Sequence, residues 1–164
     1  MMDRRLLVTG VVLAGGVLMA PAEAQDGGAS RAVAERFAAT LSAHDIAAFA
    51  DLFADGYVNH QVSAAAPPPP ADKSPKQATI GFFAARLAGI PDLQVVVEAV
   101  VAAPDQFAAS FVYSGTHGGP LYGVAATGKH LRFTSCDIFR LQAGKIAEHW
   151  GMGDIAGVLA QLRS

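Results

Sequence analysis

The chain ends in a short stretch whose side chains could move protons. "EHWGMGD", residues 148–154, places a glutamate, a histidine, a tryptophan and an aspartate close together. Carboxyl and imidazole groups are frequent general acids and bases, and an indole ring can stack on an apolar substrate. The stretch is either the wall of an acid–base pocket or the polar end of an ordinary core strand.

The preceding strand carries a second candidate acid. Alternation places one set of side chains on a common face: Phe133, Ser135, Asp137, Phe139 and Leu141. A carboxyl group on an apolar face resists ionisation unless it meets a cation or hydrogen-bond donors, which makes Asp137 a candidate general acid or base. The alternative for Asp137 is a buried ion pair with an arginine such as Arg132 or Arg140.

Asp154 follows the last strand and precedes an apolar helical repeat. Aspartate in that place is commonly a helix N-cap, although a cap at the rim of a cavity could also act on a substrate. On the last strand, alternation predicts that His149 points away from one shared face, which consists of Ile146, Glu148, Trp150 and Met152.

The histidines do not have metal-ligand spacing. There is no H-x-H or H-E-x-x-H pattern, and a site assembled in space from His60, His117 and His149 is the less favoured alternative. His60 and His117 fall at strand ends, where a pocket mouth would lie. We therefore predict no metal and no cofactor, but a pocket of acids and imidazoles among phenylalanines, Tyr113, Tyr122 and Trp150.

Nucleophilic catalysis finds little support. There is no G-x-S-x-G, no serine lies beside a histidine, and the glycine-rich "GTHGGPLYG" is not followed by G-K-[ST] as in a phosphate-binding loop. The single cysteine, Cys136, cannot form an internal disulfide and is predicted to be a buried structural thiol.

Helical repeats precede the strands that would carry these residues. Ser30 is predicted to cap a first helix and Asp45 a short second one. "SPKQ", residues 74–77, has the form of a capping box with proline in the first turn, and Gly89 with Pro91 would end that helix. Residues 64–76, "AAAPPPPADKSPK", read as a proline-rich loop, after a short extended piece that carries His60.

The apolar period then changes from about 3.6 to 2. Strands are predicted over 93–101, 107–116, 129–141 and 146–152, and Asp154 begins a closing helix. Helices followed by an antiparallel meander indicate an α+β fold. We expect one curved antiparallel sheet wrapped over about three helices, as a cone with an internal cavity.

Composition limits the function classes. The chain has 164 residues, of which 52% are hydrophobic and 16% charged, which suits one globular domain. The net charge is −2 and the sequence has no basic block, so it gives no sign of the positively charged surface that binds nucleic acids.

The first residues are typical of a leader. "MMDRR" supplies positive charge, "LLVTGVVLAGGVLMA" an apolar run, and "AEA" a small-residue cleavage site. We predict a signal peptide over residues 1–24, cleaved after Ala24, and a mature domain over 25–164 that is secreted or periplasmic in a bacterium. The run is too short and glycine-rich for a stable membrane span, although an uncleaved anchor is the alternative.

The motifs together resemble one family. "GTHGGPLYGVAATGKHLRF" and "CDIFRLQAGKIAEHWGMGDIAGVLAQL" are similar to the SnoaL-like polyketide cyclases, also called ester cyclases, of the nuclear transport factor 2-like superfamily. "IPDLQVVVE" and "YVNHQ" match further pieces of the family pattern, so the resemblance covers nearly the whole mature chain. Ala125 and Ala126 depart from it, since the family usually has proline before the threonine-glycine turn.

The resemblance implies an α+β cone with a deep apolar cavity and cofactor-free intramolecular aldol chemistry. An aspartate would act as general base and acid, placed at Asp154 with Asp137 as the alternative, and His149 would be a further catalytic residue. The remaining predicted site residues would bind a small hydrophobic carbonyl compound: His60, His117, Tyr113, Tyr122, Phe133 and Trp150. The resemblance also implies a homodimer or homotetramer formed through the exposed sheet face.

Two functions stay open at this point. One is a cofactor-free enzyme of cyclase, lyase or isomerase type. The other is a non-catalytic small-ligand-binding or accessory protein with the same pocket, because a fold alone does not decide a function. Whether the protein is an enzyme therefore depends on the surroundings of its acids.

Overall fold

The computed structural model describes residues 27–61 and 71–164. The predicted signal peptide lies outside the described residues. The elements, in chain order, are α1 Gly28–Ser42, α2 Ile46–Ala50, β1 Phe53–Asn59, α3 Pro75–Gly89, β2 Gln94–Ala103, β3 Gln106–Thr116, β4 His130–Gln142, β5 Lys145–Gly153 and α4 Ile155–Arg163. The predicted α+β class is confirmed.

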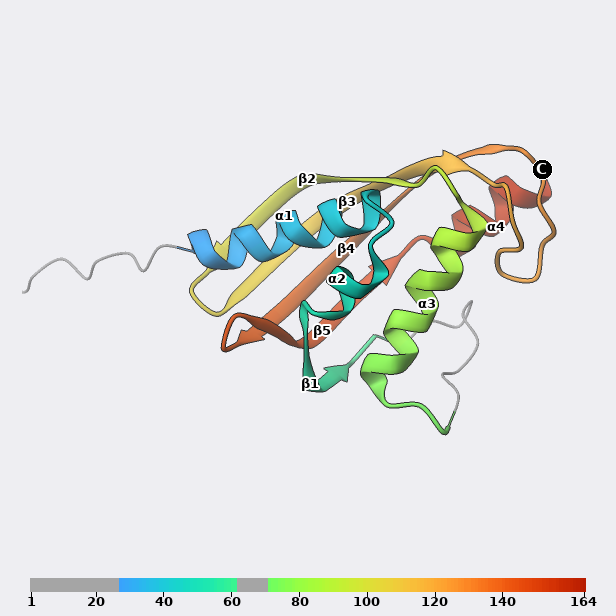
Figure 1. The fold of residues 1–164 in the computed structure, drawn as a ribbon. Coiled ribbons are helices and arrows are strands. Elements are labelled where there is room, and N and C mark those ends of the chain that lie inside the picture. Colours follow the sequence, from blue (N-terminus) through green and yellow to red (C-terminus); the bar gives the residue numbers. More distant parts are fainter. Residues whose placement is uncertain (1–26, 62–70) are drawn as a thin grey trace, which may run out of the picture.

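One five-stranded sheet, in the order β1-β5-β4-β3-β2, organises the fold. The four strands from β2 to β5 form the predicted antiparallel meander, whereas β1 pairs parallel to β5 at one edge. The short extended piece predicted around His60 is therefore a fifth strand that ends at Asn59. Figure 1 shows α1, α2 and α3 over one face of the curved sheet, with α4 at the far end near the C-terminus.

The core fills the space between the helices and this inner face of the sheet. The Phe37 ring from α1 lies 5.0 Å from Phe49 of α2 and 4.9 Å from Phe111 of β3, measured between ring centroids. Burying an aromatic or aliphatic side chain of this size contributes about 1.5–3 kcal/mol. The aromatic cluster therefore fixes the helices over the sheet.

Two of the three helix starts predicted before the strands are confirmed. The Ser74 hydroxyl accepts a hydrogen bond from the Gln77 N–H, and the Gln77 side-chain oxygen accepts one from the Ser74 N–H. Asp45 caps α2 by accepting from the Ala48 N–H. The prediction for Ser30 is wrong: α1 begins at Gly28, and the buried Ser30 hydroxyl donates to the Pro104 carbonyl across the turn between β2 and β3.

Alternation along β4 places Ser135 and Asp137 on the inner face, as predicted. The same alternation corrects the prediction for Cys136, because a residue between two inward neighbours points outward, and its thiol is exposed. On β5, Ile146 is buried rather than on the face of Glu148. A bulge, where Arg140 pairs with Glu148 but Leu141 with Ile146, adds one residue and turns Ile146 inward.

The turn before β2 is tied to the end of β3 by one carboxylate. Asp92 accepts from the Thr116 N–H at 2.5 Å and from the Thr116 hydroxyl at 2.8 Å. These bonds, the backbone one foremost, hold the pKa of Asp92 below its usual 3.8. Because Asp92 binds protons less readily in the folded chain, its contribution to stability is complete above pH 3.8 and is lost as the pH falls through the lower folded pKa.

Asp92→Asn should therefore be less stable than the wild type near neutral pH, with a gap in the free energy of unfolding that closes on acidification below pH 3.8. Urea unfolding of both proteins over a series of pH values measures this gap. A gap that stays constant with pH would show that the charge of Asp92 contributes nothing.

Candidate acid–base site

A buried carboxylate–imidazole pair lies on the inner face of the sheet. Asp137 on β4 and His149 on β5 are 5% and 7% exposed, and His149 Nε2 lies 2.8 Å from Asp137 Oδ1. When Asp137 is ionised, Nε2 carries the proton that it donates, and Nδ1 keeps a lone pair. The pair can therefore take up or release one proton within the protein.

The register of β4 and β5 explains how the two side chains meet. Asp137 lies directly opposite Gly151, while His149 lies opposite Phe139 and stacks on its ring at 4.6 Å. Asp137 and His149 are therefore diagonal neighbours on one face, within reach of each other. Gly151 has no side chain, and a Cβ there would collide with both Asp137 Oδ1 and His149 Nε2.

A second donor holds the other oxygen of the carboxylate. The Ser135 hydroxyl donates to Asp137 Oδ2 at 2.5 Å, and it lies 3.4 Å from the Tyr113 hydroxyl. The arginine pairing considered for Asp137 is wrong, because Arg140 points outward and pairs with Glu148. Both oxygens of the Asp137 carboxylate therefore have a hydrogen-bond partner.

Two buried tyrosines stay protonated beside this carboxylate. Burial raises the pKa of Tyr113 to about 12, and burial also raises the pKa of Tyr57 to about 12. Arg86 opposes the first shift and the nearby Thr79 the second, while the negative charge of Asp137 adds to both. At neutral pH both phenols are therefore hydrogen-bond donors rather than bases.

The Tyr57 hydroxyl is one of the buried groups of the site that lack a hydrogen-bond partner among the described residues. Tyr57 is 2% exposed, and its hydroxyl has no hydrogen-bond partner among the described residues. A buried hydroxyl without a partner is costly, so it marks a place where a ligand oxygen would be favoured.

Arg86 of α3 closes the aromatic side of the site. Its guanidinium lies over four rings at 4.8–5.2 Å, and it donates to the Tyr122 hydroxyl at 3.1 Å. Two of these rings, Tyr113 and Phe133, stack on each other at 5.0 Å on neighbouring strands. The predicted residues Tyr113, Tyr122 and Phe133 thus gather on the same side of the sheet as Asp137.

His60 and Trp150, in contrast, lie on the outer face of the sheet. Their rings stack at 4.5 Å, and His60 Nε2 is 2.8 Å from a carboxylate oxygen of Glu148. The hydrogen bond from His60, followed by that from Arg140, holds the pKa of Glu148 below its usual value. These residues are separated from the acid–base pair by the sheet itself, because Trp150 alternates with His149.

His117 is buried at the end of β3, away from the solvent. Its Nδ1 accepts from the Thr127 N–H at 3.1 Å, which leaves the proton of the neutral ring on Nε2. That Nε2 has no hydrogen-bond partner in the described ranges. The bond to Thr127 joins the G-T-H and T-G-K motifs across the loop between β3 and β4.

Asp154, the other candidate acid, is exposed and caps α4. Its carboxylate accepts from the Gly157 N–H at 2.8 Å, as the capping interpretation predicts. In the part of the chain that the structure describes, its side chain forms no hydrogen bond or ion pair with Asp137 or His149. Of the two candidate aspartates, Asp137 is therefore the buried one and Asp154 is the exposed helix cap.

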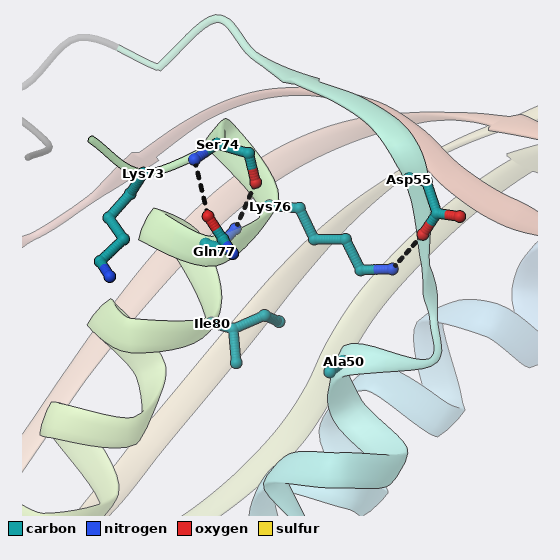
Figure 2. Close-up of a pocket in the computed structure, with 7 residues that line it drawn as sticks. All are labelled: Ala50, Asp55, Lys73, Ser74, Lys76, Gln77 and Ile80. Atoms are coloured by element: carbon teal, nitrogen blue, oxygen red, sulfur yellow. Dashed lines mark hydrogen bonds and ion pairs between the residues drawn. The ribbon is translucent and has the colours of Figure 1, made fainter. Parts of the chain in front are cut away.

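A pocket of about 620 Å³ opens at the start of α3. Figure 2 shows its lining, where Lys76 is held by Asp55 at 2.9 Å beside the capping box of Ser74 and Gln77. None of the predicted site residues line it. The cavity predicted above Asp137 stays a prediction.

Residues 27–61 and 71–164 bring no three histidine, cysteine, aspartate or glutamate side chains into a group that could hold a metal ion. In the same residues, no helix combines the length and the apolar character that a membrane span requires.

Comparison with models of known protein families shows which family the chain belongs to. The model of the SnoaL-like polyketide cyclases matches residues 31–162. The protein belongs to this family. The match includes both strands of the Asp137–His149 pair and the helix that carries Arg86. A search of curated proteins finds no match to this chain.

Solved structures of the family share the fold. IdmH from Streptomyces antibioticus, described as a candidate polyketide cyclase, is 26% identical with a TM-score of 0.68, over 82% of this chain and 98% of its own. AclR from Streptomyces galilaeus, described as a candidate hydroxylase, is 22% identical with a TM-score of 0.70, over 84% and 98%. A SnoaL-like protein from Jannaschia is 20% identical with a TM-score of 0.68, over 84% and 93%. The superfamily predicted from the motifs is thus confirmed.

Sequence reasoning missed three residues of the site: Tyr57, Arg86 and Ser135. Tyr57 could have been found, because Val58 and His60 share the outer face of one strand and leave Tyr57 on the inner one. Ser135 was placed on the correct face without a role. Arg86 gave no signal, since an arginine near a helix end is usually a solvated or dipole-paired residue.

Proposed function

We propose that the protein is a cofactor-free acid–base enzyme that acts on a hydrophobic carbonyl compound, with the Asp137–His149 pair as its proton-transferring group. The observation that carries this proposal is the buried pair itself, with both carboxylate oxygens held by donors and an unpartnered Tyr57 hydroxyl near it. Ordinary structural carboxylates are solvated or paired with Lys or Arg.

The reaction proposed is an intramolecular aldol-type closure. The pair removes a proton alpha to a carbonyl, so the C–H electrons pass into an enolate whose oxygen accepts a hydrogen bond from Tyr57. The enolate carbon then forms a bond to a second carbonyl carbon, and the resulting alkoxide takes the proton back from the pair. No electrons are gained or lost, and no co-reactant is required.

The first half of this reaction can be tested without the natural substrate. Exchange of the alpha protons of an aryl ketone such as 1-tetralone for deuterium, followed by NMR in D₂O, reports proton abstraction directly. We expect the wild type to accelerate exchange above the buffer rate, and Asp137→Asn to lower the acceleration by about 10²–10⁴-fold, the range that a general base supplies.

Asp154→Asn is the comparison that separates the two aspartates. Asparagine caps a helix about as well as aspartate, so α4 should keep its start and the exchange rate should stay within about two-fold of the wild type. If Asp154→Asn loses the exchange and Asp137→Asn keeps it, the assignment of the base is wrong. If the wild type binds aryl ketones but exchanges none, the protein is a binder rather than an enzyme.

Location and assembly are part of the proposal. The sequence pattern of residues 1–24 supports export to the periplasm or the exterior. A homodimer or homotetramer is supported by apolar side chains on the outer face of the sheet, where Val101 and Met152 are 77% and 75% exposed.

A further inference from the structure

Arg86 is a buried cation without a counter-ion. It is 5% exposed, and in the part of the chain that the structure describes it forms no ion pair with a carboxylate. A buried charge is costly unless an opposite charge and hydrogen bonds offset the loss of water. The position of Arg86 on α3 is therefore unlike that of a surface arginine.

Its protein contacts compensate only part of this cost. The faces of Phe82, Phe83, Tyr113 and Phe133 supply cation–π attraction. A guanidinium has five N–H donors, however, and the Nε donor of Arg86 is buried with no partner in the described residues. The hydrogen bond to Tyr122 satisfies one donor of another nitrogen. An acceptor is therefore missing at Nε.

A continuous line of contacts connects this cation to the acid–base pair. Arg86 lies over the Tyr113 ring, the Tyr113 hydroxyl lies 3.4 Å from the Ser135 hydroxyl, and Ser135 donates to Asp137. The charges of both Arg86 and Asp137 act on the pKa of Tyr113, Arg86 lowering it and Asp137 raising it. One bound molecule could thus meet the cation at one end and the Asp137–His149 pair at the other.

We infer that Arg86 binds a carboxylate of the ligand, so that this site takes an apolar carbonyl compound that also carries a carboxylate. A carboxylate matches the planar donor fork of a guanidinium, supplies the missing acceptor and neutralises the buried charge. The four rings suit the apolar body beside that carboxylate. This inference rests on the proposed function, from which it takes the location of the site. What it adds is that the ligand carries a negative charge.

Binding of benzoate and of benzamide to the full chain tests the inference. The two probes have nearly the same shape and differ in charge. At neutral pH and low salt we expect benzoate to bind about ten-fold more tightly, the advantage of a charged over a neutral hydrogen-bonded pair. Titration followed by ¹⁵N NMR should shift the Arg86 Nε–H signal with benzoate and leave it in place with benzamide, after assignment through bonds to the Arg86 backbone.

Variants separate this site from the acid–base pair. Arg86→Gln should remove the preference for benzoate, and Arg86→Lys should keep part of it because the charge remains. Asp137→Asn should keep the preference for benzoate even though it stops proton exchange. The anion site can therefore be tested even if Asp137 is not the base.

Equal affinity of the two probes, no binding of either, or an unmoved Arg86 Nε–H signal would overturn the inference. A preference for benzoate that survives in folded Arg86→Gln would also overturn it. If the variants do not fold, as circular dichroism would show, the wild-type NMR titration alone decides between the outcomes.

Discussion

Gly151→Ala should abolish alpha-proton exchange although it replaces no group that transfers a proton. Gly151 lies opposite Asp137 in the register of β4 and β5, and a Cβ at this position would occupy the space where Asp137 Oδ1 and His149 Nε2 meet. The methyl group must therefore push the two side chains apart. Because a general base contributes about 10²–10⁴-fold, we expect a loss of at least about 10²-fold in the exchange rate.

The same substitution should lower the free energy of unfolding by about 2–4 kcal/mol, since it leaves buried polar groups without partners and overpacks the inner face. Urea unfolding measures this loss beside the exchange assay. Gly153→Ala is the matched control, because it lies two residues along the same strand and the nearest atom to its Cβ would be 4.0 Å away, in ordinary contact. Equal behaviour of the two variants would argue against a pair that depends on Gly151.

Gly115→Ala should be strongly destabilising although it lies outside the site. A Cβ on Gly115 of β3 would collide with the Ile90 side chain, and it would lie 2.9 Å from Asp92 Oδ1 and 3.2 Å from the Leu93 Cα. The backbone of the turn before β2 must then move, which breaks the bonds from Thr116 to Asp92. We expect the free energy of unfolding to fall by about 2–4 kcal/mol, as for other overpacked core positions.

Gly81→Ala should raise the free energy of unfolding, whereas Gly115→Ala should lower it. Gly81 lies within α3, and nothing lies within 4 Å of the Cβ that it would gain. Alanine is a better helix former than glycine, so this variant should be about 0.5–1 kcal/mol more stable than the wild type. A Gly115→Ala protein as stable as the wild type would show that residues 90–93 can shift without cost.

Much of the fold is encoded locally, which is why the sequence predicts it. The capping box at Ser74 and Gln77 forms between neighbours in the chain, so it depends on no distant residue. Alternation along β4 places Asp137 inward for the same reason, because successive side chains of a strand point to opposite faces. The G-T-H, D-I-F-R and E-H-W motifs resemble one family, which the match over residues 31–162 confirms.

Predictions from local sequence patterns are wrong where a side chain bonds to a residue that is distant in the chain. Ser30 has the type and place of an N-cap, yet its hydroxyl bonds to Pro104, seventy-four positions along the chain. The bulge between β4 and β5 likewise moves Ile146 to the inner face, because pairing between strands and not the sequence of one strand sets the register.

The sequence by itself determined that Asp137 faces the interior and that His149 turns away from Trp150. Only the tertiary structure decided that these two side chains form a pair, that Gly151 makes room for it, and that Tyr57 is buried and Arg86 is buried over the Tyr113 ring. The physical reason is that alternation fixes the direction of a side chain within its own strand, whereas a contact requires the register and packing of elements that are far apart in the chain.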